Sequence, residues 1–174
     1  MKTFHQATQG ESSLLRLPFG LPRSWNLAPW VPIPIRLIVG YGFVAHGLAK
    51  LAKGPDSFTA ILYALHVPAP HLMTWVTILT ELLGGAAVLL GALVPLVTVP
   101  MAAVLLVAIL TVHLPFGFTS IKLMSVTAAG PQFGRPGYET DLLYLAGLAA
   151  LVMGGAGPFA VDGFLRKRLW PSNQ

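Results

Sequence analysis

The stretch LMTWVTILTELLGGAAVLLGAL, residues 72–93, decides the fold class, because it carries a single ionisable side chain, Glu81, in an otherwise uncharged apolar run. A helix needs about 20 predominantly apolar residues to cross the hydrocarbon core of a bilayer. Residues 72–93 meet that length. We therefore interpret this stretch as a membrane span.

Three further apolar stretches of similar length follow the same pattern, at residues 33–51, 97–115 and 138–155. Pro34 and Pro100 fall in or near the first turn of their stretches, where a missing N–H is tolerated. A soluble core helix can imitate one such stretch, but hardly four. The sequence therefore predicts an all-α fold, an integral membrane four-helix bundle whose antiparallel spans run up and down.

The composition supports a lipid environment. Hydrophobic residues make up 55% of the chain and charged residues only 10%, whereas a soluble domain has about 25% charged residues. The net charge is +5, but the basic residues are too sparse for a nucleic-acid surface, so the bilayer is the expected partner. Cysteine is absent, which excludes disulfides, thiolate nucleophiles and iron–sulfur clusters within this chain.

The chain divides into three parts. Residues 1–30 form an N-terminal segment that is either interfacial or disordered, and its leucines are interrupted by Arg16 and Arg23, unlike a secretory signal. Residues 31–165 hold the four spans. Residues 166–174 form a basic tail, in which Arg, Lys and Arg follow one another from position 166.

The basic residues predict the orientation. Lys2, Arg16, Arg23 and the cluster at 166–168 lie on one side of the predicted bundle. The other side carries Lys50, Lys53, Lys122 and Arg135, which are offset by the acidic residues Asp56, Glu139 and Asp141. Because Lys and Arg are enriched on the cytoplasmic side, both termini are expected in the cytoplasm.

Glu81 is the most conspicuous polar residue, because a charge near the bilayer centre costs at least ~2.5–3.5 kcal/mol on insertion scales. It lies near the middle of the second span. It is either a proton-accepting or ligand-binding carboxylate, or a paired or protonated Glu that joins two helices. The sequence leaves both alternatives open.

Most of the ionisable residues in the spans fall in the half that the orientation places outside. At least one comes from each helix: His46, Lys50, Glu81, His113, Glu139 and Asp141. The cytoplasmic half of the four spans holds only Arg36. This asymmetry predicts a polar pocket that opens outward. The loop over residues 116–137 carries aromatic residues that form either a lid over this pocket or an interfacial belt.

The two imidazoles, His46 and His113, are predicted at similar depth. They could bind haem from opposite sides, but hydrogen-bonded core histidines are the commoner arrangement, so haem is the less favoured alternative. No ligand motif with close spacing, such as His-Glu-x-x-His, is present, and no metal site is predicted. Gly40 and Gly47 on the first span would let a neighbouring helix approach closely.

The order of these features resembles the DoxX family of small bacterial membrane proteins over residues 31–165. The matching pieces are Arg36, Gly40, Phe43, His46-Gly47 and Lys50, then Glu81, Gly84-Gly85 and Leu89-Leu90-Gly91, then His113 and Gly117-Phe118, and finally residues 133–139, Gly157-Pro158 and Asp162. The resemblance implies a four-helix fold in the bacterial cytoplasmic (inner) membrane. Some relatives are similar to membrane subunits of thiosulfate:quinone oxidoreductase, which pass electrons into the quinone pool.

Three functions follow as hypotheses. The first is a quinone-linked redox subunit, in which Glu81 and His113 act catalytically by exchanging protons with a quinone. His46 would bind a quinone oxygen and Lys50 would guide an anionic substrate, with Glu139 and Asp141 as further ligand-binding residues.

The second hypothesis is a non-catalytic subunit that anchors membrane or periplasmic partner subunits, which the absence of cysteine and of a redox-centre motif favours. The third is a small proton-linked carrier, although only one leaflet is rich in ionisable groups and no complete path is visible. Whether the chain is itself an enzyme stays open.

Overall fold

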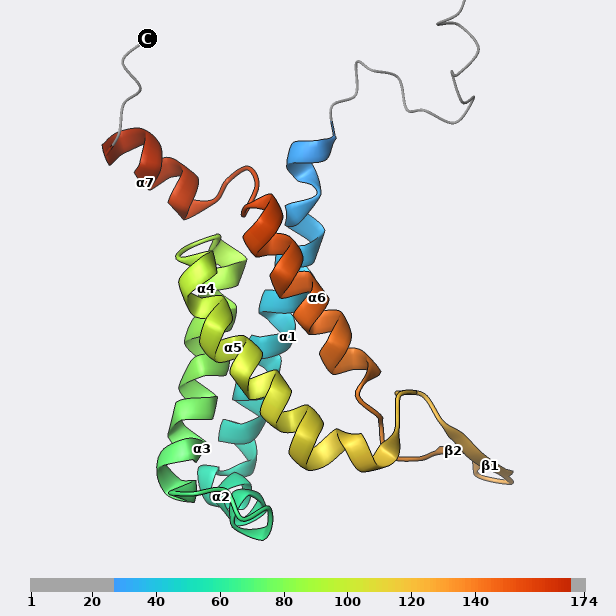
Figure 1. The fold of residues 1–174 in the computed structure, drawn as a ribbon. Coiled ribbons are helices and arrows are strands. Elements are labelled where there is room, and N and C mark those ends of the chain that lie inside the picture. Colours follow the sequence, from blue (N-terminus) through green and yellow to red (C-terminus); the bar gives the residue numbers. More distant parts are fainter. Residues whose placement is uncertain (1–26, 170–174) are drawn as a thin grey trace, which may run out of the picture.

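The computed structural model describes residues 27–169 and is mostly helical, with one short β-hairpin (Figure 1). The predictions for residues 1–26 of the N-terminal segment and for residues 170–174 of the basic tail lie outside the described residues. The side chains at positions 166 and 167, on which much of the orientation prediction rests, are not described either.

Three long helical rods run in alternating directions. The first consists of η1 (Ala28–Trp30) and α1 (Pro32–Lys53). The second joins α3 (Pro70–Leu79), the π-helical turn η2 (Thr80–Gly84) and α4 (Gly85–Leu90). The third joins α5 (Val94–Ala108), the π-helical turn η3 (Ile109–His113) and the 3-10 turn η4 (Leu114–Phe116).

These rods are the three helices in the described part of the chain that are long and apolar enough to span a membrane, at Ala28–Lys53, Pro70–Leu90 and Val94–Phe116. They confirm the first three predicted spans. The fourth predicted span corresponds to α6 (Glu139–Gly154), which has only 16 residues. At ~1.5 Å per residue it covers ~24 Å, less than the ~30 Å of a typical hydrocarbon core. The crossing of α6 therefore stays a prediction.

Two helices and a two-stranded hairpin were not predicted. The helix α2 (Pro55–Ala64) follows α1 and is joined to α3 by a hydrogen bond of 2.8 Å between the Thr59 and Thr74 hydroxyls. The strands β1 (Leu123–Thr127) and β2 (Gly130–Phe133) form an antiparallel hairpin between the third rod and α6. The helix α7 (Val161–Leu169) ends the described chain, and the predicted boundary at residue 166 falls inside it.

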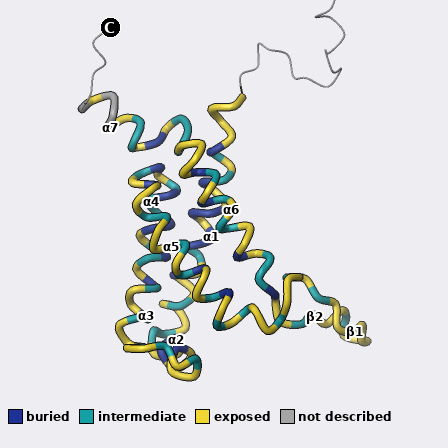
Figure 2. The backbone as a smooth tube through the Cα atoms, in the orientation of Figure 1, coloured by how far each residue is buried: buried dark blue, intermediate teal, exposed yellow. Residues whose placement is uncertain are grey.

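The core is shared by α1, α4, α5 and α6, and its buried side chains include Val39, Val88, Met101 and Leu148. The outward surfaces of the rods carry large exposed apolar side chains, as expected of a surface in contact with lipid (Figure 2). The helices α1 and α4 approach each other closely at Gly40 and Gly85. A Cβ atom on Gly40 would lie 2.8 Å from the Gly85 carbonyl oxygen. As expected for Gly40, only a residue without a side chain permits this contact.

Arg36 of α1 is only 4% exposed and ties three segments together. Its Nε and Nη2 donate to the carbonyl oxygens of Val88 and Leu89, at 3.1 and 2.6 Å, and its Nη1 donates to those of Ala156 and Pro158, at 2.9 and 3.3 Å. The last carbonyls of a helix lack partners within the helix and carry the negative end of its dipole. A guanidinium therefore suits the end of α4 and the linker after α6.

Asp162 of α7 completes this arrangement from the other side of the α4–α5 turn. Its two carboxylate oxygens accept from the backbone N–H groups of Leu93 and Val94, at 2.9 and 3.3 Å, and so cap the start of α5. Its own N–H donates to the carbonyl oxygen of Gly91 at 3.1 Å. We call these contacts of Arg36 and Asp162 the clamp, and this end of the molecule the clamp end. The opposite end, where α2 lies, is the α2 end.

The clamp generates a stability prediction. Substitution of Arg36→Leu removes a charged donor from four carbonyl oxygens, and a hydrogen bond from a charged group contributes about 1.5–3 kcal/mol. We expect the free energy of unfolding in detergent to fall by at least about 2 kcal/mol, measured by denaturation in sodium dodecyl sulfate. The matched control is Arg168→Leu on the exposed surface of α7. Equal stability of the two variants would contradict the role of the clamp.

Candidate functional site

Lys50 and Glu81 form an ion pair between α1 and η2. The Lys50 Nζ atom lies 2.7 Å from both carboxylate oxygens of Glu81, and only 7% of the Glu81 side chain is exposed. Gly47, one turn before Lys50, leaves the space that α1 and η2 need to come close enough for this pair. A Cβ atom at Gly47 would lie 2.8 Å from Cγ of Leu82 and 3.2 Å from Cβ of Glu81. The lack of a side chain at Gly47 therefore lets η2 approach α1.

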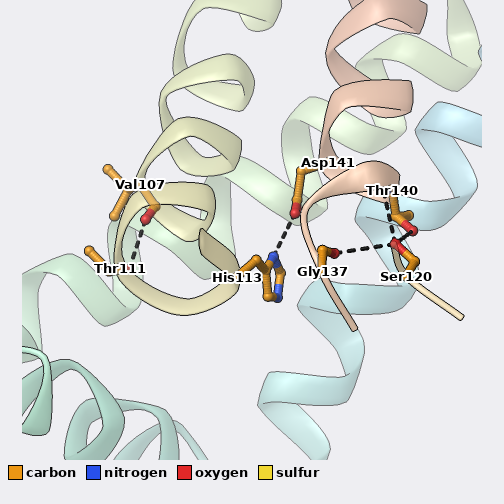
Figure 3. Close-up of polar contacts among 7 residues, drawn as sticks. All are labelled: Val107, Thr111, His113, Ser120, Gly137, Thr140 and Asp141. Atoms are coloured by element: carbon orange, nitrogen blue, oxygen red, sulfur yellow. Dashed lines mark hydrogen bonds and ion pairs between the residues drawn. The ribbon is translucent and has the colours of Figure 1, made fainter. Parts of the chain in front are cut away.

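His113 and Asp141 form the second pair, between η3 and α6. The His113 Nδ1 atom lies 2.5 Å from Oδ2 of Asp141, and Figure 3 shows the imidazole directed from the end of the third rod towards the carboxylate. This contact fixes the orientation of the ring. The other ring nitrogen of His113, Nε2, takes no part in the contact with Asp141.

Glu81 and His113 both lie in π-helical turns. Glu81 is the second residue of η2 and His113 is the last residue of η3. A π turn contains one residue more than an α turn, so it shifts the direction of the side chains within it, and such turns are frequent at functional sites. In both rods the regular helix is thus interrupted at the residue that contributes to a polar pair.

Members of both pairs line one cavity of about 140 Å³ between α1, η2, α5 and α6. Its polar lining includes His46, Lys50, Glu81, Asp141 and Tyr144. Its apolar lining includes Phe43, Val104, Leu105 and Ala108. We call this space the cavity. The structure thus brings four of the six predicted site residues together around it.

A wider open cleft of about 470 Å³ adjoins the cavity and shares His46 and Lys50 with it. His113 lines this cleft, together with Lys53, Ser57 and Phe58. Four of its lining side chains are Lys or His, and none is acidic. Lys50 and His113 are already paired with carboxylates, so His46 and Lys53 are the basic side chains that an anionic group in this cleft would meet.

Glu139 lies apart from the other predicted site residues. Its Oε2 accepts from the backbone N–H of Ser120 at 2.9 Å. The Ser120 hydroxyl donates to the Gly137 carbonyl at 3.2 Å (Figure 3). Glu139 lines neither the cavity nor the cleft. The structure places it at the base of the hairpin, where it joins the two legs of the loop.

The sequence analysis missed Tyr144, which lines the cavity and packs edge-to-face against Phe43 with ring centroids 5.7 Å apart. The signal was present, since Tyr144 follows Asp141 by three residues and so shares its helix face. Of the two alternatives for the aromatic residues of the loop, a lid or an interfacial belt, the lid is not supported, because none of them lines the cavity. Instead, Phe118 and Tyr138 pack together at the base of the hairpin, with ring centroids 5.7 Å apart.

The cavity offers ligands for an organic head group more readily than for a metal. Among the residues that the structure describes, no group of three or more His, Asp or Glu is placed to hold a metal ion. The polar groups instead surround a partly apolar space. They supply nitrogen donors from His46 and Lys50 and carboxylates from Glu81 and Asp141.

Comparison with known proteins yields two similarities. The family model described as DoxX matches residues 31–114, which contain the Lys50–Glu81 pair and His113. An uncharacterized membrane protein of Mycobacterium tuberculosis, Rv3486, is 31% identical over 144 residues, which cover 78% of this chain and 82% of that protein. No solved structure matches the chain.

The Lys50–Glu81 pair generates a prediction for a double-mutant cycle. Each single substitution, Lys50→Met or Glu81→Gln, removes one partner from a contact that is largely shielded from water. Loss of a hydrogen bond to a charged group costs about 1.5–3 kcal/mol. The double variant should lose less than the sum of the two single variants, because no partner is left alone.

The measurement is the free energy of unfolding of the four proteins in detergent. Lys53→Met, at an exposed lysine one turn further along α1, is the matched control and should stay within about 0.5 kcal/mol of the unsubstituted protein. Additive effects of the two substitutions would show that Lys50 and Glu81 do not act as a pair.

Proposed function

The chain belongs to the DoxX family of membrane proteins, and from that premise we propose that it is a quinone-linked redox subunit whose cavity holds the quinone head group. One observation carries the proposal. The Lys50–Glu81 pair and Asp141, the partner of His113, line a single cavity that also has apolar walls, and His113 lines the cleft that adjoins it.

The lining fits such a group chemically. A quinone head group is a flat ring with two carbonyl oxygens, so it needs apolar contact over its faces and hydrogen-bond donors at its edge. Phe43, Val104 and Leu105 supply the apolar contact. His46 and Lys50 supply nitrogen donors at the same cavity, as the sequence analysis anticipated for His46.

The residues of the chain have distinct roles in this proposal. When bound, a quinone takes up two electrons and two protons and becomes a quinol. Glu81 carries one exchangeable proton, and Lys50 holds its carboxylate in place. Asp141 orients His113 through Nδ1, so that Nε2 can carry the other proton. Lys53, with Lys50, attracts an anionic substrate to the cleft.

We assign the centre that delivers the electrons to another protein chain. The sequence has no cysteine, and the chain therefore cannot ligate an iron–sulfur cluster or run a thiol relay by itself. A membrane or periplasmic partner subunit that holds the electron donor is thus part of the proposal.

A second candidate function is a non-catalytic anchor for partner subunits. It is favoured by the observation that, within residues 27–169, no buried side-chain nitrogen or oxygen lacks a hydrogen-bond partner. A polar network whose members already satisfy one another is what structural contacts between membrane helices require. In this alternative the two pairs join helices and bind nothing.

The topology is also part of the proposal. We place the chain in the bacterial cytoplasmic membrane as four spans, with both termini in the cytoplasm and the cavity opening outward. Leu148 and Leu151 of α6 are buried against α1 and α5, which supports α6 as a member of the bundle. A short apolar helix can cross where the bilayer thins locally.

The quinone proposal predicts the effect of one substitution. Glu81→Gln keeps the shape of the side chain and removes the exchangeable carboxylate proton, so quinone-dependent electron transfer in native membranes should be abolished. Glu139→Gln, the same change outside the cavity, should retain full activity. Full activity of the Glu81→Gln variant would refute the role of Glu81.

The companion measurement is mass spectrometry of the lipid extract of gently purified protein, with copurifying chains identified. Bound quinone supports the redox subunit. A quinone-free protein that retains partner chains, and whose Glu81→Gln variant is destabilised but supports normal electron transfer, favours the anchor.

The topology predicts the accessibility of single cysteines, which the cysteine-free chain makes easy to introduce. Thr119 is exposed in the loop before α6, outside the strands of the hairpin, and a Cβ atom at Gly163 of α7 meets nothing within 4 Å. A membrane-impermeant maleimide should label Thr119→Cys in spheroplasts and Gly163→Cys only after lysis. Labelling of both positions from the same side would show that α6 does not cross.

A further inference from the structure

The β1–β2 hairpin has a firmly paired base. The two legs of the loop are joined by backbone hydrogen bonds from Tyr138 to Gly117, from Glu139 to Phe118 and from Gly134 to Lys122, at 3.1, 2.9 and 2.9 Å. The Glu139 carboxylate adds the contact with the N–H of Ser120. The direction of the hairpin is therefore set by the ends of the third rod and of α6.

That direction is sideways. The hairpin leaves the end of the third rod and projects away from the helices, instead of continuing past the end of the bundle (Figure 1). The third rod is a candidate membrane span that ends at Phe116. A segment that leaves laterally at this level lies close to the plane where the hydrocarbon core meets the head groups.

Nearly all residues of the hairpin are exposed (Figure 2). The large apolar side chains in and beside its strands are each more than half exposed, up to 77% at Ile121: Ile121, Leu123, Met124, Val126 and Phe133. The two-stranded ribbon has no core of its own in which these side chains could be buried. Exposed apolar side chains that gather in this way mark an interaction site.

The charges of the loop suit a lipid surface. Residues 119–137 contain Lys122 and Arg135 and no acidic residue. The Arg135 guanidinium lies over the ring of Phe116, 5.4 Å from its centroid. Aromatic and basic residues beside exposed aliphatic side chains are the signature of segments that lie in the membrane interface.

We propose that the β1–β2 hairpin is an interfacial anchor, whose apolar side chains insert among the lipid head groups and upper acyl chains beside the bundle. Lys122 and Arg135 then face lipid phosphates. The hairpin would hold the third rod and α6 at a fixed depth and tilt. This role is independent of the proposed quinone chemistry.

The edges of the hairpin disfavour the main alternative, a partner protein that adds a strand. Pro131 of β2 has no N–H to donate, and the pairing of β1 is irregular at Met124, between Leu123 and Ser125. Proline and bulges are features that protect strand edges from pairing. The exposed surface is thus better suited to lipid than to strand addition.

The test places an environment-sensitive fluorophore at Val126→Cys in vesicles of phosphatidylethanolamine and phosphatidylglycerol. Val126 is exposed, so the label does not disturb packing. We expect blue-shifted emission, quenching by lipids that carry a nitroxide on the upper acyl chain, and iodide quenching several-fold weaker than that of labelled free cysteine. Leu106→Cys, exposed near the middle of the candidate span Val94–Phe116, provides the membrane-immersed reference.

Two outcomes would overturn the proposal. Strong iodide quenching without lipid quenching would place the hairpin in water. Shielding from iodide that appears only when a copurified chain is present, again without lipid quenching, would assign the surface to a protein partner. A second pair of variants carries the label at Met124→Cys. Val126→Glu should raise the iodide quenching of this label, because a charged side chain draws the hairpin out of the lipid. Val126→Leu should leave the quenching unchanged.

Discussion

The rest of the structure depends on a charged guanidinium among apolar helices. Arg36 is surrounded by carbonyl oxygens from the end of α4 and from the linker after α6, and these groups need donors where water is scarce. Hydrophobic attraction cannot hold helices together in lipid, since lipid chains are as apolar as leucine. The polar contacts of Arg36 and Asp162, with the close glycine contact between α1 and α4, therefore supply what burial supplies in a soluble protein.

The two ends of the molecule use polar groups differently. At the clamp end, each polar side chain contacts backbone groups, so the helix ends are capped and the turn between α4 and α5 is fixed. At the α2 end, side chains contact side chains across helices, beside the cavity. Contacts between a side chain and the backbone fix the structure, because the backbone partner does not titrate. Two paired ionisable side chains, in contrast, can exchange a proton. The fixed end thus allows the other end to hold titratable groups in defined positions.

Much of the fold was predictable because the length of an apolar stretch can be read directly from consecutive residues of the sequence. The ends of the first three spans were predicted to within three residues, except that the first rod begins five residues earlier than expected. The glycine contact at Gly40 was also expected. The helix α2 was missed although Gly54-Pro55-Asp56 is a helix-start signal. The hairpin was missed because its short strands depend on pairing at a base that the sequence does not display.

The sequence predicted most of the residues that line the candidate site, but it did not predict which of them form pairs. Glu139 and Asp141 were treated alike, yet two residues on a helix differ by about 200° in direction, and only Asp141 faces the cavity. The partners of Glu81 and His113 depend on the π turns, which no periodicity argument anticipates.

The clamp also has a consequence for biogenesis. Arg36 lies 120 residues before Ala156 and 122 before Pro158, two of its acceptors. During synthesis from the N-terminus, Arg36 enters the bilayer long before these carbonyls exist. It lies near the start of α1, so its side chain can reach the interface while it waits. The clamp can close only after the segment that follows α6 has been synthesised, so its closure requires that α1, α4 and α6 are all in place.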